Sequence, residues 1–181
     1  RDFIVNDPLQ GLREAVRDRL AADRRDSAGQ PARAGWLLVT HRLGGGVEKH
    51  VMDLVALLGD QVRVEVLRPW GTHGVQLQDS QGNTLTRDAG DAGAFAAMLT
   101  TLLRSRSYVR VHVHHLHGFV ADVMPALQAL GLPYDLTLHD FGIYCPQYAL
   151  STAEGDYCGE PDLAGCEGCV ARRPHPWQIG V

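Results

Sequence analysis

The sequence predicts an α/β fold in which a doubly wound, mostly parallel sheet is covered by helices on both faces. From Gly35 onward, short apolar runs alternate with segments whose apolar residues recur at helical spacing. Such alternation favours right-handed crossovers between parallel strands. Three glycines soon after the first apolar run are typical of the strand-to-helix turn in this architecture. The chain has 181 residues, of which 45% are hydrophobic, enough for one medium-sized core.

Residues 1–34 are expected to lie outside this domain. Residues 8–22 carry apolar side chains at helical spacing and predict an upstream helix. Residues 23–34 mix charged residues with glycine and proline and have no apolar face, which is typical of a linker. We therefore expect an upstream helix and linker at 1–34 and the α/β domain at 35–181. Because the first residue is arginine, we also expect the chain to be part of a longer protein.

The first half of the domain is predicted to contain a strand, a helix and then three strands. Residues 36–41 form a short apolar run typical of a buried parallel strand. Residues 47–58 repeat apolar side chains at helical spacing. Residues 62–69 alternate apolar and polar side chains, which predicts the second strand. Residues 74–90 resemble a hairpin that turns at 81–83.

The second half continues the alternation. Residues 91–104 predict an amphipathic helix with Asp91 as its N-cap. A strand at 108–116, a helix at 118–130 and a strand at 134–140 follow. The residues after 140 show no periodicity.

Composition and charge exclude some classes of function. The formal net charge of −4 argues against electrostatic binding of nucleic acid or of anionic membranes. No apolar run approaches the roughly 18 residues that a transmembrane helix needs. No basic-then-apolar leader is visible either, so we expect a cytoplasmic protein.

Gly44, Gly45 and Gly46 are predicted to bind a ligand. In doubly wound sheets, ligands bind beyond the carboxyl ends of the strands, where loops lead into helices. Glycine amides let a ligand approach closely, and the N-terminus of the following helix favours an anion. The alternative is that these glycines only satisfy the geometry of a tight turn. The chain matches neither a dinucleotide fingerprint, which would need glycine in place of Lys49, nor a phosphate-binding P-loop.

Histidines cluster near the end of the predicted strand at 108–116. His112 and His114 share one face of the strand, and His115 and His117 share the other. An H-x-H pair can bind a metal, but no cysteine or carboxylate lies close in the sequence. We therefore interpret His115 and His117, at the carboxyl end of the strand, as residues that line a cleft.

His139 and Asp140 end the last predicted strand. The carboxyl end of that strand is expected at the same edge of the sheet as the triple glycine. A neutral imidazole at that edge can exchange one hydrogen bond with a hydroxyl or a phosphate of a ligand. The alternative is a histidine that is satisfied by local hydrogen bonds and has no chemical role.

The four cysteines, Cys145, Cys158, Cys166 and Cys169, all fall within 25 residues. Their spacing closes with C-x2-C, which is common in zinc sites. The surrounding sequence has little periodic core, so a structural zinc ion can supply order. A disulfide pair, free thiols or an iron–sulfur cluster remain alternatives, and His175 can replace one of the ligands.

Three blocks of sequence resemble the N-terminal half of family-4 glycosyltransferases of the GT-B fold. They are "LGGGVEKHVMDLVALL", "VHVHHLHG" and "LTLHDFGIYCP", and the last is followed by a C-x-x-C pair. The resemblance covers residues 35–181. It implies a Rossmann-like domain that holds the sugar acceptor. It also implies that a C-terminal domain, absent from this chain, binds the nucleoside diphosphate sugar.

The resemblance assigns roles to individual residues. Gly44–Gly46 face the cleft between the two domains, together with Glu48 and Lys49 at the start of the first helix. His139 matches a histidine that contacts the transferred sugar or the acceptor. The implied reaction is retaining transfer without a catalytic metal, because helix dipoles and cationic side chains stabilise the leaving group. The chain alone is expected to be inactive.

A second interpretation is a non-catalytic α/β module that binds other proteins through a zinc knuckle. In either interpretation the Cys-rich segment at 145–169 is an excursion from the domain, and in the first it shapes the acceptor side of the cleft.

Overall fold

The computed structural model describes residue 14 and residues 34–59, 61–88, 94–119 and 123–173. Its contacts divide the chain into two compact units, Arg1–Leu136 and Thr137–Val181. The first unit contains the sheet and the second contains the cysteines. Apart from residue 14, which is helical, the upstream helix and linker expected at 1–34 lie outside the described residues, except for Ala34.

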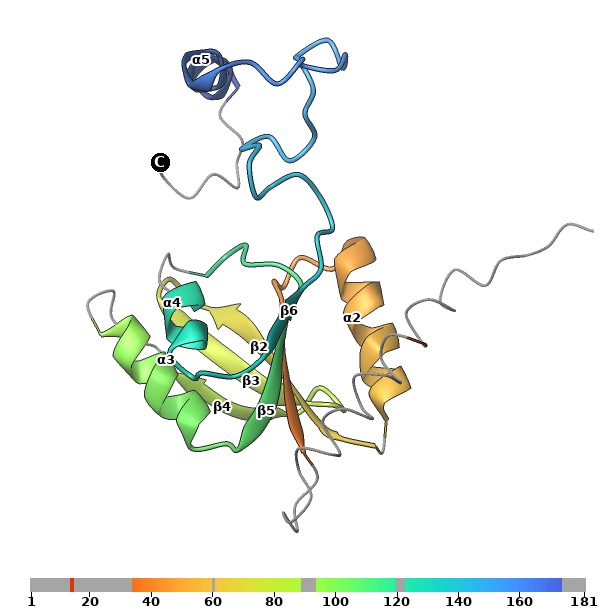
Figure 1. The fold of residues 1–181 in the computed structure, drawn as a ribbon, viewed down its shortest axis with the longest axis vertical. Coiled ribbons are helices and arrows are strands. Elements are labelled where there is room, and N and C mark those ends of the chain that lie inside the picture. Colours follow the sequence, from red (N-terminus) through yellow and green to blue (C-terminus); the bar gives the residue numbers. More distant parts are fainter. Residues whose placement is uncertain (1–13, 15–33, 60, 89–93, 120–122, 174–181) are drawn as a thin grey trace, which may run out of the picture. The chain divides into compact units, whose positions relative to one another are not determined.

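A six-stranded mixed sheet forms the centre of the first unit (Figure 1). The strand order is β4-β3-β2-β1-β5-β6; β2, β1, β5 and β6 are parallel, whereas β3 and β4 pair antiparallel. The α/β prediction is confirmed at this level, and the arrangement is compatible with a Rossmann-like fold. The strands are β1 (Gly35–Val39), β2 (Arg63–Trp70), β3 (Gly74–Asp79), β4 (Thr84–Asp88), β5 (Tyr108–Val113) and β6 (Tyr134–Leu136).

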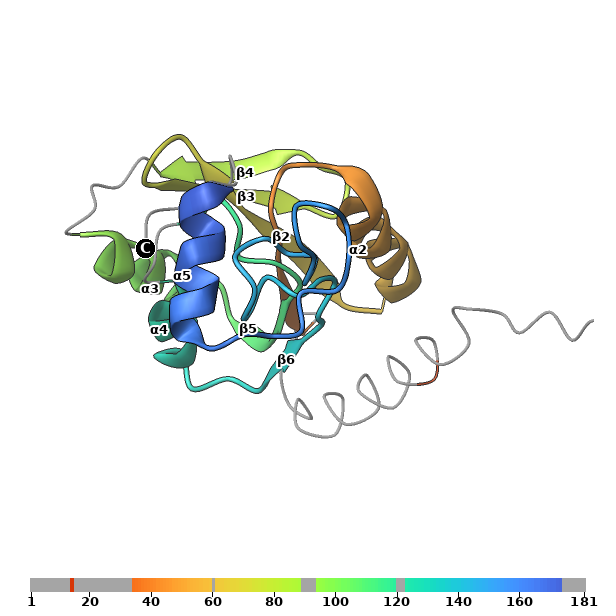
Figure 2. The ribbon, with the colours of Figure 1, turned by 90° about the horizontal axis from the view of Figure 1, so that it is seen from above.

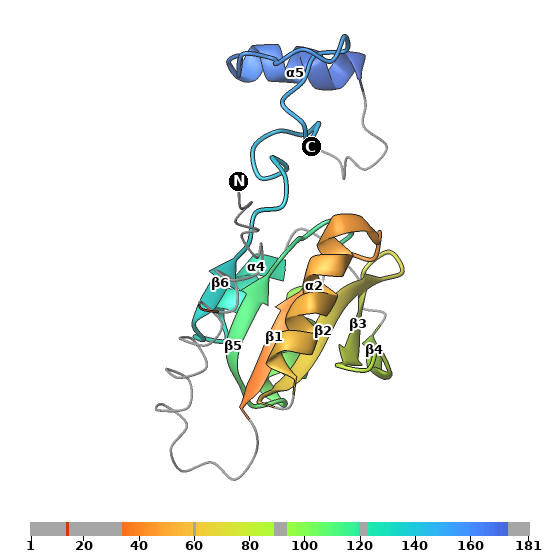
Figure 3. The ribbon, with the colours of Figure 1, turned by 90° about the vertical axis from the view of Figure 1, so that its right-hand side faces the viewer.

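Helices cover both faces of this sheet. Helix α2 (Gly45–Leu58) lies on one face, across β1 and β2, and α3 (Phe95–Arg104) and α4 (Val123–Gln128) lie on the other (Figures 2 and 3). The alternation along β1 explains this, because Trp36 and Leu38 belong to the core cluster beneath α2, whereas Leu37 and Val39 belong to the cluster beneath α3 and α4. None of the helices in the described part of the chain has the length and apolar character needed to cross a membrane.

The order of the parallel strands reverses at β1. The chain passes from β1 to β2 on one side, and β5 later pairs with β1 on the other side. Val39 is opposite Val113 at the carboxyl ends of β1 and β5. In open α/β sheets, ligands bind at such a switch point, beyond the carboxyl ends of the strands.

The hairpin predicted at 74–90 is present. Strands β3 and β4 pair antiparallel. One carboxylate oxygen of Asp79 accepts the backbone N–H groups of Gln81 and Asn83 at 2.9 and 2.8 Å. Gly82 has a φ of 81°, which glycine adopts without strain. Local turn chemistry therefore fixes this hairpin where the sequence placed it.

Strand β5 ends at Val113 instead of residue 116, and helix α4 ends at Gln128 instead of residue 130. Two other elements differ more from the prediction. Strand β6 spans only three residues instead of 134–140, because its partner β5 ends at Val113 and the ladder runs out. Helix α5 (Leu163–Arg172) was not expected. It has no buried residue, so it lacks the apolar stripe by which a sequence pattern reveals a helix. Residue 91, the expected N-cap of the third helix, lies outside the described residues.

A side-chain hydrogen bond at its N-terminus, and not apolar burial, stabilises helix α5. The carboxylate of Asp162 accepts the backbone N–H of Gly165 at 2.9 Å and caps the helix. Such a cap contributes about 1 kcal/mol to helix stability. Among the described residues of the second unit, only Gln147 is buried, and none belongs to either core cluster.

Candidate functional site

Two loops of the first unit meet at the switch point. One leaves β1 and contains the glycines, and the other leaves β5 and contains the histidines. The backbone N–H of His114 donates to the carbonyl of Val39 at 2.8 Å. The rings of His41 and His115 lie 4.9 Å apart between centroids, edge to face. The loop that contains the glycines and the loop that follows β5 therefore lie side by side. The predicted convergence of Gly44–Gly46 with His139 stays a prediction.

The backbone at the start of α2 explains two of the three glycines. Gly44 has φ 75° and ψ −151°, a region that is essentially restricted to glycine, and Gly45 has φ 74°. No side chain caps the helix N-terminus. Gly46 has no such backbone requirement, and a Cβ atom built on it meets nothing within 4 Å. The turn itself requires Gly44 and Gly45, but only the approach of another group would require Gly46.

Arg68, at the carboxyl end of β2, holds this loop in place. Its guanidinium donates to both carboxylate oxygens of Glu48 at 2.6 and 2.7 Å, and also to the backbone carbonyl of His41 at 2.7 Å. Only 8% of the Arg68 side chain is exposed. A bidentate ion pair in this setting fixes geometry as well as charge. The interaction joins β2, the first turn of α2 and the loop between β1 and α2.

This contact changes the interpretation of Glu48 and Lys49. The carboxylate of Glu48 is occupied by Arg68, so Glu48 positions the loop. Lys49 instead forms an exposed pair with Asp53, one helical turn later, at 2.6 Å. The two adjacent residues were predicted to act as a polar pair facing a ligand, but in the structure they have separate partners. Their binding of a ligand stays a prediction.

His41 is a buried, neutral imidazole next to the glycines. Only 5% of the residue is exposed, and its Nδ1 accepts the backbone N–H of Leu43 at 3.1 Å. Burial lowers its pKa to about 4, assisted by the nearby His115 and His117 and partly opposed by Glu48. An imidazole that accepts at Nδ1 and is uncharged carries its proton on Nε2.

His115 repeats the same pattern on the second loop. Its Nδ1 accepts the backbone N–H of His117 at 2.9 Å, so the neutral ring also has its proton on Nε2. The rings of His115 and His117 lie 6.0 Å apart, and both residues are partly buried. The site thus contains two imidazoles whose tautomer is set by the backbone. The Nε2–H of His41 can donate to a hydroxyl or phosphate oxygen.

Sequence reasoning missed three residues of this site. They are His41, Arg42 and Arg68. Arg42 donates to the Oε1 of Gln76 at 2.9 Å, and its guanidinium lies 5.3 Å from the centre of the Trp70 ring. A signal was available, because a charged or histidine side chain at the end of an otherwise apolar strand lies at the ligand-binding edge of such a sheet.

His139 and Asp140 belong to the second unit. Both are partly buried. A carboxylate oxygen of Asp140 accepts the backbone N–H of Gly142 at 2.8 Å, which forms a local turn. The proposed role of Asp140 in binding an acceptor, and the position of His139 relative to the glycine loop, stay predictions.

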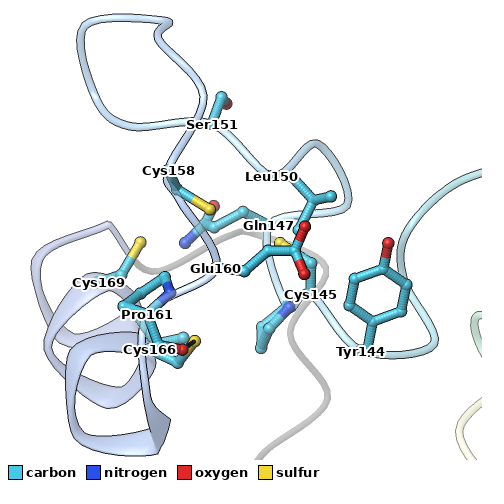
Figure 4. A pocket seen from close by; sticks show the side chains of 12 residues that line it. Tyr144, Cys145, Gln147, Leu150, Ser151, Cys158, Glu160, Pro161, Cys166 and Cys169 are labelled. Atoms are coloured by element: carbon cyan, nitrogen blue, oxygen red, sulfur yellow. Dashed lines mark hydrogen bonds between the residues drawn. The ribbon is translucent and has the colours of Figure 1, made fainter.

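All four cysteines line one pocket of the second unit (Figure 4). The pocket has a volume of about 300 Å³. None of the four forms a disulfide, and no three of their Sγ atoms lie within 4.8 Å of one another. The structure therefore brings the predicted ligand set to one place, with the thiols farther apart than a bound metal would hold them.

Comparison of the chain with protein-family models, with curated proteins and with solved structures finds no match.

Proposed function

We propose that this chain is the acceptor-binding, N-terminal domain of a retaining GT-B glycosyltransferase. The observation that carries the proposal is the switch-point edge of the sheet, where an open glycine loop lies beside two imidazoles with fixed tautomers. A sugar acceptor presents several hydroxyl groups in a small volume. Binding it requires short, directional donors and backbone that a ligand can approach closely.

Each part of this edge has a role in the proposed binding. The Nε2–H of His41 donates to a hydroxyl or phosphate oxygen of the acceptor, and the ring of His115 lies beside it. Gly46 leaves room for the acceptor to contact the first turn of α2. The N-terminus of this helix has no side-chain cap and favours a partial negative charge. Arg68 does not bind the acceptor in this proposal, because it is occupied in holding the loop.

The reaction also needs groups outside this edge. By resemblance, His139 contacts the transferred sugar or the acceptor. A second Rossmann-like domain binds the nucleoside diphosphate sugar and supplies cationic side chains that stabilise the departing diphosphate. No catalytic divalent metal is required for this chemistry. The chain alone should consequently bind an acceptor but show no sugar transfer above buffer.

An NMR titration tests this proposal. The ¹⁵N-labelled chain is titrated with a panel of mono- and disaccharides and, separately, with nucleoside diphosphate sugars. At least one saccharide should shift the amide signals of Gly44–Gly46 and the side-chain signals of His41 and His115. Nucleoside diphosphate sugars should shift them less. If no saccharide moves these signals, or if the chain alone transfers sugar, the proposal is wrong.

The variant Gly46→Ala provides the sharpest control. The added methyl group meets no atom of the chain, so the fold should be unaffected. It would fill the space that the acceptor is proposed to occupy, and the affinity for the saccharide should fall by at least about tenfold, or roughly 1.4 kcal/mol. Met52→Ala, an exposed change on the same helix, should bind as the unmodified chain does.

A second function, a protein-binding module with a zinc knuckle, is favoured by a different observation. The cysteine segment belongs to a compact unit of its own and is not a loop of the sheet domain. The protein encoded by the longest reading frame that contains these residues distinguishes the two proposed functions. Glycosyltransferase activity in that product supports the enzyme, whereas inactivity toward every donor and acceptor, together with capture of a protein partner by residues 137–173, supports the module.

A further inference from the structure

The second unit lacks the source of stability that the first unit has. Its described residues contain no buried apolar side chain, and several of its large apolar residues are exposed. The free energy of ordering a backbone is unfavourable by about 1–2 kcal/mol per residue and must be offset by other interactions. Small segments without a core usually rely on disulfides or on a structural metal. No disulfide links the four cysteines.

Helix α5 presents two of the cysteines together. Cys166 and Cys169 are three residues apart, which places them on the same face of the helix. Both line the pocket. The Asp162 cap fixes where the helix begins and therefore which face these two thiols share.

The other two cysteines are anchored by backbone hydrogen bonds. The N–H of Cys145 donates to the carbonyl of Phe141 at 2.8 Å, and its own carbonyl accepts the N–H of Tyr148 at 2.9 Å. The N–H of Cys158 donates to the carbonyl of Leu150 at 2.9 Å. These turns position both side chains at the same pocket as α5 (Figure 4).

We propose that Cys145, Cys158, Cys166 and Cys169 bind one zinc ion as a closed tetrathiolate site, and that this ion orders the second unit. The proposal is independent of sugar transfer. Zinc–sulfur bonds of about 2.3 Å place tetrahedral ligands about 3.8 Å apart. Because no three of the thiols lie within 4.8 Å of one another, the four side chains must converge when zinc binds.

Thiolates are also the best donors available around the pocket. Glu160 lines it too, but its carboxylate accepts a hydrogen bond from the hydroxyl of Tyr157. Soft thiolates select zinc over calcium or magnesium. Four cysteine ligands leave no open coordination position, so the site is structural rather than catalytic. His175, the other candidate ligand in the sequence, lies outside the described residues and is not part of the proposed set.

Metal analysis of the whole chain tests the site. Protein purified under reducing conditions without chelator should contain one equivalent of zinc. After removal of that zinc, cobalt should bind in its place and give the intense visible absorption of tetrahedral thiolate-bound Co²⁺. Less than about half an equivalent of zinc, iron with inorganic sulfide in its place, or two disulfides in the reduced preparation would each overturn the proposal.

Single substitutions test the ligand set. Each of the four Cys→Ser variants should lose zinc and the tetrahedral cobalt spectrum. Glu160→Gln and His175→Gln should retain both. Retention of stoichiometric zinc by any Cys→Ser variant, or its loss in His175→Gln, would contradict four cysteine ligands. Where a variant is insoluble, the same question is answered with the unmodified chain. Removal of zinc should expose four reactive thiols, and adding zinc back should protect all four.

Discussion

The two units of this chain differ in the interactions that are available to stabilise them. The first unit packs two apolar clusters on the two faces of one sheet, and the side chains at the centre of β1 are completely buried. The second unit has turns, one capped helix and four cysteines around a pocket, without an apolar core among its described residues. Burial of apolar surface stabilises the first, and we propose that metal–thiolate bonds stabilise the second.

Polar residues have different roles in the two units. In the first unit the core supplies stability, so polar residues at the edge of the sheet are available for positioning a loop and for binding. Arg68 and His41 illustrate this. In the second unit the cysteines, which are its most reactive side chains, are proposed to stabilise the fold by binding a metal.

The largest effect expected from a single change is loss of a core side chain. Leu38→Ala removes a fully buried side chain beneath α2 and should lower the free energy of unfolding of the first unit by about 2–5 kcal/mol. Leu163→Ala removes a side chain in the second unit that is 75% exposed, and should change the free energy of unfolding of the chain by less than about 0.5 kcal/mol. Urea denaturation followed by tryptophan fluorescence measures the free energy of unfolding of both variants. Equal losses in the two variants would contradict the view that an apolar core stabilises the first unit but not the second.

The second largest effect expected is a change in the stability of the first unit with pH. The pKa of His41 is about 4 in the fold and 6.5 in an unfolded chain. Between these values the unfolded state binds more protons, so stability should fall as the pH is lowered through this window, by up to about 3 kcal/mol in total. His41→Asn keeps an acceptor for the N–H of Leu43 but cannot titrate. Its stability should therefore depend less on pH across that window, whereas an unchanged slope would exclude His41 as the cause.

A smaller effect is expected from the pair that holds the glycine loop. Glu48→Gln leaves the buried guanidinium of Arg68 without its charged partner and should destabilise the first unit by about 2 kcal/mol. Lys49→Gln, at the neighbouring residue, removes only an exposed pair and should cost less than about 0.5 kcal/mol. Thermal denaturation of the two variants provides the comparison. If both behave alike, Glu48 does not have the positioning role assigned to it.

The smallest effect expected is a difference in stability between variants of two glycines in the loop. Gly44→Ala forces alanine into a backbone region that is essentially restricted to glycine, and should destabilise by about 1–2 kcal/mol. Gly46→Ala lies within the first turn of α2 and should be neutral or stabilising by less than about 1 kcal/mol. Calorimetry of the two variants measures the difference. A destabilised Gly46→Ala would show that this glycine serves the turn and not a ligand.

The sequence predicted the first unit well because its signals are local and periodic. The strand alternation, the turn at 81–83 and the glycine loop each follow from residues that are close in the chain. The contact between Glu48 and Arg68 was not predictable in the same way, because the two residues are 20 positions apart and meet only when β2 lies beneath α2. The early end of β6 likewise depends on where its partner strand stops.

The second unit was predicted less completely for a different reason. Helix α5 has no buried residue and thus no apolar periodicity to detect. The spacing of the four cysteines suggested a common site, and all four line one pocket, but spacing carries no information on the distances between the thiols.

Amide hydrogen exchange of the unmodified chain, with and without a strong zinc chelator, tests whether zinc orders the second unit. Chelation should remove exchange protection from residues 141–173 while β1, β2 and β5 keep theirs. Unchanged protection across the cysteine segment in a zinc-free sample would contradict this role of zinc, because the second unit would then be ordered without metal.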